Sequence, residues 1–256
     1  MTKQFKPEKA RDWEPNRIIV PCLAQPKIDG VRSLNRDGKF LARTLKPHAN
    51  KHITRLYSIP ELHGMDGELY LTELGATHPD LCRNTTSAIN RIEGEPKMTW
   101  TVFNYITDEI AHLSYTERMI LLNEKIEELV GDGIIGVNGL DIKMVFSNKV
   151  NSLEELEDID DIHLNLGYEG TIIRDPNALY KYGRSDLKMQ CWRIKRFIEE
   201  EFLITGFTEG NKNNNEAKTN ELGRSERSSH KENMEPNGLI GSFQGVTIKD
   251  IVDPNS

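Results

Sequence analysis

The stretch "QPKIDGVR", residues 25–32, follows the apolar run "RIIVPCLA" and sets a lysine, an aspartate and an arginine close together. Its Asp-Gly pair predicts a hairpin turn. On a strand, Lys27 and Asp29 would share one face, and a turn at Asp29-Gly30 would bring Arg32 back beside Lys27. A surface hairpin with a salt bridge explains this octapeptide about as well as a reactive site does, so the rest of the sequence has to decide.

A lysine beside an arginine can become a nucleophile. The amine reacts only without its proton, and the ordinary lysine pKa is about 10.4. Burial and neighbouring cations lower the pKa of a lysine. If this strand is buried and Arg32 folds back, Lys27 is the candidate catalytic residue.

Two glutamates and a basic strand extend the candidate site. Glu68 in "MDGELY" and Glu169 in "YEGTIIR" each enter an apolar strand. Carboxylates at such places can bind Mg²⁺, which prefers oxygen ligands and bridging phosphates. In "WRIKRF", Arg193 and Lys195 alternate with apolar residues, so both leave one face and can bind phosphate oxygens. Exposed strand ends and a solvated strand face are the alternatives for these residues taken singly.

The composition is that of a soluble globular protein. The chain has 256 residues, 37% of them hydrophobic and 29% charged, and a formal net charge of −7. No global basic field indicates a polyanionic partner, so any nucleic-acid contact must come from a local patch. Cys22, Cys82 and Cys191 form no CxxC pair, which argues against a zinc site or a disulfide framework. Without a signal peptide or a long apolar run, we expect a cytoplasmic protein (in the host cytoplasm if viral).

The pattern of apolar residues predicts an α+β protein. Strands are predicted at 17–28, 31–36, 39–43, 65–71, 99–106, 141–146, 169–175, 190–197, 200–207 and 239–252, and helices at 50–62, 85–92, 114–130 and 151–162. Ser114 with Glu117 and Ser152 with Glu155 have the spacing of capping boxes. Pro21 and Pro26 interrupt the first strand and favour a sheet edge.

Two segments have few apolar residues. Residues 1–16 predict a poorly ordered lead-in or a short helix, and the polar run 208–238 predicts a flexible loop or linker. We therefore expect one domain over 1–198 and the opening strands of a second β unit over 199–256.

Five short elements carry a resemblance to a known family. In order, "KIDGVR", "DGELY", "VFNYI", "EGTIIR" and "RIKRF" resemble the motif series of the covalent nucleotidyltransferases, above all the ATP-dependent DNA ligases of the small phage or viral type. "ARTLKP" (42–47) resembles the element that follows the nucleophile in these ligases. "EEFLITGF" and "GLIGSFQGVTIKD" resemble the first strands of the family's OB domain. The resemblance implies an ATP-grasp-like nucleotidyltransferase domain, with antiparallel sheets flanked by helices, and then a partial OB-fold.

The resemblance also implies a reaction. Lys27 would attack the α-phosphate of ATP, release pyrophosphate and become a lysine–AMP. AMP would pass to the 5′-phosphate of a nick, and the 3′-hydroxyl would displace it to form the phosphodiester bond. The implied cofactors are ATP and Mg²⁺ (or Mn²⁺). The implied partner is nicked double-stranded DNA. We expect a monomer that does not associate with a membrane.

The implied roles fall on residues that match the motifs. Phe103 would stack on adenine, Gln25 and the nearby backbone would read the adenine edge, and Lys195 would contact the α-phosphate. Arg193 stands where the family usually has lysine. The implied nucleotide-binding set is Gln25, Pro26, Lys27, Arg32, Arg43, Glu68, Phe103, Glu169, Arg193 and Lys195. The implied metal ligands are Glu68 and Glu169, and the implied DNA-binding residues are Arg43, Lys46, Lys181, Arg184 and Lys188.

Besides Arg193, two features depart from the family pattern. Asn104 stands where many ligases have an acidic residue. An OB domain has about five strands, whereas this chain supplies about two, and the basic motif that closes the family pattern has no counterpart before Ser256. An RNA ligase, an mRNA-capping guanylyltransferase and a non-catalytic nucleic-acid-binding module are the alternatives. An NAD-dependent ligase is disfavoured because no nicotinamide-recognition domain fits before Lys27 and zinc cysteines are absent.

Overall fold

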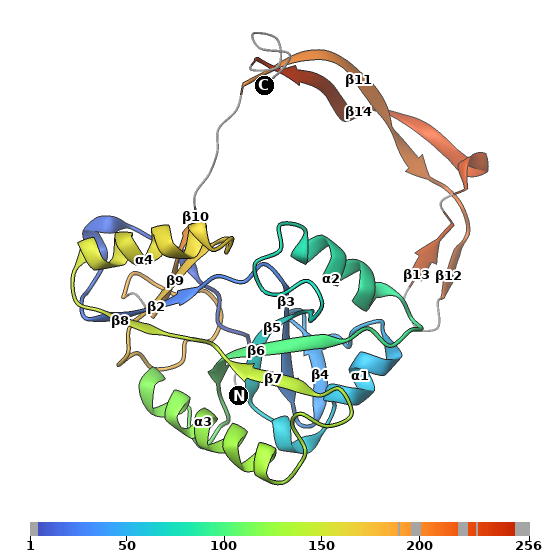
Figure 1. Ribbon diagram of the computed structural model, residues 1–256. Coiled ribbons are helices and arrows are strands. Elements are labelled where there is room, and N and C mark those ends of the chain that lie inside the picture. Colours follow the sequence, from blue (N-terminus) through green and yellow to red (C-terminus); the bar gives the residue numbers. More distant parts are fainter. Residues whose placement is uncertain (1–4, 189, 196–200, 220–224, 229, 249–256) are drawn as a thin grey trace. The chain divides into compact units, whose positions relative to one another are not determined.

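The computed structural model describes residues 5–188, 190–195, 201–219, 225–228 and 230–248 (Figure 1). Its contacts divide the chain into two compact units, Met1–Arg196 and Phe197–Ser256. The first unit holds two five-stranded sheets and the helices that cover them. The α+β class predicted from the sequence is confirmed.

The first sheet has the strand order β1-β10-β9-β2-β8. The bounds are β1 (Arg11–Asp12), β2 (Cys22–Pro26), β8 (Asn148–Val150), β9 (Gly170–Arg174) and β10 (Cys191–Lys195). Helix α4 (Leu153–Asn165) packs on this sheet, and Leu156 joins the core that Trp192, Ile173 and Val150 form. The pairing is antiparallel except between β1 and β10.

The second sheet has the order β4-β3-β5-β6-β7. The bounds are β3 (Val31–Arg36), β4 (Lys39–Ala42), β5 (Met65–Leu71), β6 (Met98–Tyr105) and β7 (Asp141–Met144), with α1 (Lys51–Tyr57), α2 (Leu81–Asn90) and α3 (Tyr115–Gly131) around it. Phe40, Tyr57 and Trp100 form an aromatic cluster in its core, with ring centroids 4.8–5.8 Å apart. The β6–β7 pair is parallel. Each sheet therefore has one parallel pair, and the expected antiparallel arrangement holds for the other pairs.

The segment 27–30 leads from β2 in one sheet to β3 in the other. The hairpin expected at Asp29-Gly30 is therefore wrong. A Cβ on Gly30 would lie 2.5 Å from the backbone oxygen of Leu69, so glycine is needed because the chain passes close to β5. The second Asp-Gly pair does form a hairpin: Asp37 and Gly38 have φ of 54° and 72° between β3 and β4, as a type I′ turn requires.

Strand β2 lies inside its sheet, between β9 and β8, so the expectation of an edge strand is wrong. Pro21 precedes the strand and Pro26 is its last residue. Neither proline breaks the ladder, because each stands at or beyond a strand end, where the missing N–H is not needed. Strand β2 can therefore lie in the interior and present the residue after Pro26 between the two sheets.

Two helices, α3 and α4 (Leu153–Asn165), begin directly after the serine residues that cap them. Ser114 and Glu117 form the expected capping box at the start of α3. Ser152 accepts from the Glu155 N–H, but the Glu155 carboxylate binds the backbone N–H of Asn151 (2.7 Å). Helix α1 ends at Tyr57, and a separate 3₁₀ turn covers Pro60–Leu62. Helix α2 begins at Leu81 rather than at the predicted residue 85.

The described part of the N-terminal segment, residues 5–17, pairs with other parts of the chain, contrary to the expected loose lead-in or short helix. Strand β1 pairs with β10, with Arg11 opposite Trp192. The backbone of Lys9 donates to Gly183 (2.7 Å) and accepts from Ser185 (2.8 Å). A 3₁₀ turn follows at Pro15–Arg17. Backbone pairing orders this polar segment without needing apolar side chains.

The second unit contains β11 (Phe202–Asn213) paired antiparallel with β14 (Met234–Thr247), and β12 (Ala217–Thr219) paired antiparallel with β13 (Ser225–Arg227). A 3₁₀ turn covers Lys231–Asn233. The polar run 208–238, expected as a loop or linker, therefore carries strands. Its backbone is held by pairing and by the Asn215 amide, which donates to the carbonyls of Ser228 (2.9 Å) and His230 (2.8 Å). No helix in the described part of the chain is long and apolar enough to span a membrane.

Candidate active site

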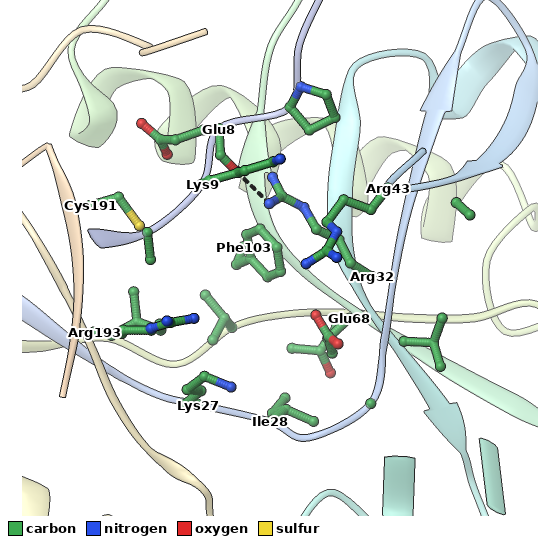
Figure 2. Close-up of a pocket in the computed structure, with 18 of the residues that line it drawn as sticks. Glu8, Lys9, Lys27, Ile28, Arg32, Arg43, Glu68, Phe103, Cys191 and Arg193 are labelled. Carbon is green, nitrogen blue, oxygen red and sulfur yellow. Dashed lines mark hydrogen bonds between the residues drawn. The ribbon is translucent and has the colours of Figure 1, made fainter. Parts of the chain in front are cut away.

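A cavity of about 1280 Å³ opens in the first unit. Its wall includes residues 5–10, 25–32 and 42–45, together with Glu68 and Phe103. Figure 2 shows the side chains of Lys27, Arg32, Arg43 and Arg193 directed into the space around the Phe103 ring. Residues distant in the sequence thus meet around one polar space with several cations.

Lys27 follows β2 and is paired with Glu169. Its Nζ donates to the Glu169 carboxylate, and about one-fifth of each side chain is exposed (20% and 21%). The backbones are also joined, with Lys27 N to Gly170 O at 2.9 Å and Glu169 N to Lys27 O at 3.0 Å. Gly170 has φ of 147°, and a Cβ there would lie 2.4 Å from the backbone oxygen of Ile194. Glycine therefore lets β9 begin close to β10 and places Glu169 at the lysine.

Glu68 lies on β5 opposite Arg32 of β3 and lines the cavity. Burial raises the pKa of Glu68 to about 8, against the opposing effects of Arg32 and Lys27. Arg32 itself is held by Asp66 through two bonds, Nε to Oδ1 at 2.9 Å and Nη2 to Oδ2 at 2.6 Å. Burial alone would lower the pKa of Arg32, but the Asp66 carboxylate more than offsets it and the pKa is raised. The result is a fixed guanidinium beside a carboxyl group that resists ionisation.

The two glutamates fit a metal that is shared with a phosphate-bearing substrate. Among the described residues, no group of three or more His, Cys, Asp or Glu side chains is placed to hold a metal ion. Mg²⁺ commonly takes one or two carboxylates and completes its shell with waters and substrate phosphates. Glu68 lines the cavity and Glu169 contacts the Lys27 amine, and their role as ligands of such an ion stays a prediction.

Phe103 and Gln25 belong to the inner wall of the cavity. The guanidinium carbons of Arg32 and Arg174 lie 5.3 and 5.8 Å from the centroid of the Phe103 ring. Gln25 is 1% exposed, and its amide donates to the hydroxyls of Tyr115 (2.6 Å) and Ser147 (2.8 Å). Both Gln25 donors are thus used within the protein, and a reading of the adenine edge by Gln25 stays a prediction.

The remaining predicted cations differ in position. Arg43 and Arg184 are exposed and line the cavity, and Arg193 lines it while binding Asp12 (2.7 Å). Lys195 pairs through its backbone with Gly170, and its side chain lies outside the described part of the structure. Lys46, Lys181 and Lys188 are not among the lining residues, and Lys181 binds Asp186 (3.3 Å).

Sequence reasoning missed three residues that support the site. Asp66 fixes Arg32, and Glu8 forms a buried ion pair with Arg174 (2.5 Å). Asp66 and Arg174 lie inside the quoted elements "DGELY" and "EGTIIR", where their polarity among apolar neighbours was a usable signal. Glu8 stands in a polar segment without any such signal.

Comparison with known proteins gave matches among solved structures alone; no protein-family model and no curated protein sequence matches. The DNA ligase–adenylate of Chlorella virus is 30% identical, with a TM-score of 0.65 over 80% of this chain and 74% of that chain. A Lig E DNA ligase is 18% identical, with a TM-score of 0.66 over 95% and 80%. The ATP-dependent DNA ligase of bacteriophage T7, in complex with ATP, is 15% identical, with a TM-score of 0.59 over 94% and 80%. The likeness to the last two concerns the fold alone.

Proposed function

The chain belongs to the ATP-dependent DNA ligases, and from this premise we propose that it seals nicks in duplex DNA through a lysine–AMP on Lys27 and a 5′-adenylated DNA. The observation that carries the proposal is the position of the Lys27 amine, which is bound by Glu169 and opens into a cavity with Glu68 and several arginines.

In the first step, Lys27 Nζ attacks the α-phosphorus of ATP. The Glu169 carboxylate contacts Nζ and accepts the proton that the amine must lose. The N–P bond forms, the bond between the α-phosphorus and its bridging oxygen breaks, and pyrophosphate leaves. Arg193 and Arg32 stabilise the charge on the phosphates, where positioning and electrostatics supply most of the catalysis. A Mg²⁺ (or Mn²⁺) held by Glu68 and Glu169 would neutralise further phosphate charge.

In the next two steps, AMP moves from Lys27 to the 5′-phosphate at the nick, and the 3′-hydroxyl then displaces AMP. Arg43 is exposed at the cavity, and its planar guanidinium suits the two oxygens of a terminal phosphate. The cavity rim therefore offers a place for the nick end beside the lysine. The Phe103 ring offers an apolar face for the base.

We also propose that residues 1–198 form the nucleotidyltransferase domain and that residues 199–256 form the beginning of an OB-fold. The division of contacts after Arg196 and the antiparallel pairing of β11 with β14 support this proposal. Lys46, Lys181 and Lys188 remain proposed DNA contacts outside the cavity, and Lys195 a proposed phosphate contact. We expect the protein to act as a monomer in the cytoplasm.

The test uses nicked duplexes with DNA or RNA at the nick, together with ATP or GTP labelled on the α-phosphate. We expect label on the protein from ATP and sealing of the DNA nick. Transfer of label from GTP alone would point to a capping enzyme, and sealing of RNA nicks alone would point to an RNA ligase. A chain that binds nicks but never acquires label would be a binding module. Each of these three results contradicts the proposal.

A further inference from the structure

We propose that Glu8 is a positioning residue of the adenylation site, which holds Arg174 and Arg32 against the Phe103 ring. The inference rests on the proposed function, because it assigns Glu8 an effect on ATP use. Glu8 itself touches no reacting atom. Its carboxylate acts through Arg174, and its backbone oxygen contacts Arg32.

Glu8 is joined to several parts of the site at once. Its side chain is 3% exposed, and its Oε2 accepts from Arg174 Nη1 (2.5 Å) and Asn104 Nδ2 (3.2 Å). Its backbone N–H donates to the Tyr180 hydroxyl (2.9 Å). Its backbone oxygen accepts from Arg32 Nη1, as the dashed line in Figure 2 shows. A single residue of the N-terminal segment thus contacts strands β3, β6 and β9.

Arg174 carries the effect of Glu8 to the inner wall. Its guanidinium carbon lies 4.6 Å from the Tyr115 centroid and 5.8 Å from the Phe103 centroid, and its Nε donates to Gln25 Oε1 (3.3 Å). Only 4% of the Arg174 side chain is exposed, so water cannot replace Glu8 as the partner of its charge. Removing one partner of a buried pair leaves the other charge uncompensated, and the guanidinium would then move. Phe103 would then lose its contact with Arg174, and Gln25 would lose the hydrogen bond to its Oε1.

The neighbouring Asn104 provides a way to separate positioning from folding. Its Nδ2 lies 3.2 Å from the Glu8 oxygen that binds Arg174, and its Oδ1 accepts from Arg118 Nη2 (3.4 Å). Asn104→Asp would place a carboxylate next to the Glu8 side chain that binds Arg174, and within reach of Arg118. In a Glu8→Gln background, this exchange moves the negative charge to the neighbouring residue without changing the total charge.

The experiment measures the rate of AMP transfer to the full chain as a function of ATP concentration. For Glu8→Gln we expect the KM for ATP to rise on the order of tenfold to a hundredfold, because binding groups are misplaced, with a smaller change in kcat. Glu8→Gln/Asn104→Asp should move KM back toward the wild-type value. Glu14→Gln is the matched control, since Glu14 lies in the same segment and pairs with Arg11 and Arg17 near the surface. It should leave KM unchanged.

Other outcomes overturn the inference. An unchanged KM in Glu8→Gln, or a double variant no better than the single one, would make Glu8 a purely structural residue. Glu8→Asp keeps the charge on a shorter side chain, so it extends the test if Glu8→Gln does not fold; a wild-type KM with a lower unfolding temperature would also mean a structural role. If the wild-type chain takes no AMP, the proposed function fails, and the inference fails with it. If the wild-type chain reacts and the variants behave as wild type, the inference alone fails.

Discussion

Lys27 and Glu169 are joined by their side chains and by their backbones, across 142 residues of chain. The ladder between β2 and β9 brings the two together, since both residues stand at the ends of these strands. The fold of the chain therefore brings the carboxylate to the amine. Under the proposed function, this contact would give Glu169 two tasks: to orient the amine and to accept its proton.

Glu169→Gln is expected to lower the single-turnover rate of AMP transfer by about 10²-fold to 10⁴-fold, the usual contribution of a positioned base. Labelled ATP mixed with the protein and Mg²⁺ gives the rate directly. Glu154→Gln, an exposed change in α4, is the control and should react as wild type. A rate in Glu169→Gln equal to the control would exclude the proton-accepting role.

We predict that the stability of the folded protein falls as the pH rises, because of the buried Glu68 carboxyl group. Its pKa is raised from 4.5 to about 8 by burial, so between these values the folded state binds more protons than the unfolded state. Stability falls with rising pH wherever the folded state binds more protons. We expect Glu68→Gln to flatten the decline in the free energy of unfolding between about pH 5 and about pH 8. Urea unfolding at both pH values measures the decline in the free energy of unfolding. An equally steep decline in Glu68→Gln would show that Glu68 does not cause it. The exposed Glu61 supplies a control, Glu61→Gln.

Gly30→Ala is expected to destabilise the protein by about 1–3 kcal/mol, the usual cost of overpacking. The new Cβ would lie 2.5 Å from the backbone oxygen of Leu69 and 3.0 Å from Glu68 Cγ, so the segment after Lys27 must shift. AMP transfer should slow as well. Gly131→Ala is the matched control, because nothing lies within 4 Å of its added Cβ. Equal unfolding free energies in the two variants would show that the close passage of the chain is unimportant.

The sequence predicted features that depend on neighbouring residues more accurately than contacts between residues that are distant in the chain. Strand 31–36 and the capping box at Ser114 depend on neighbours in the chain, and both are confirmed. Glu8 and Arg174 are 166 residues apart, and no local pattern relates them. The prolines misled the placement of β2, because a proline at a strand end looks in sequence like one that breaks the ladder. Arg11 and Asp12 pair with β10, and Lys9 pairs with Gly183 and Ser185. A polar composition does not reveal such pairing.

Binding to nicked DNA is expected to be weak and to fall steeply with salt concentration, because the chain has a net charge of −7 and must bind phosphates through a local set of cations. Arg184 lines the cavity and its side chain is 67% exposed. Arg184→Ala should reduce the slope of log K against log salt by about one. Lys39→Ala, an exposed change on β4 outside the cavity lining, should leave the slope unaltered. DNA binding that does not depend on salt concentration would contradict the proposal that these cations bind DNA phosphates.

The mass of the intact protein after exposure to ATP and Mg²⁺ tests the central claim most directly. We predict that the wild-type chain gains the mass of one AMP, that peptide mapping places it on Lys27, and that Lys27→Ala gains none while keeping its fold. A wild-type chain that keeps its original mass, or carries AMP on another residue, would contradict the account.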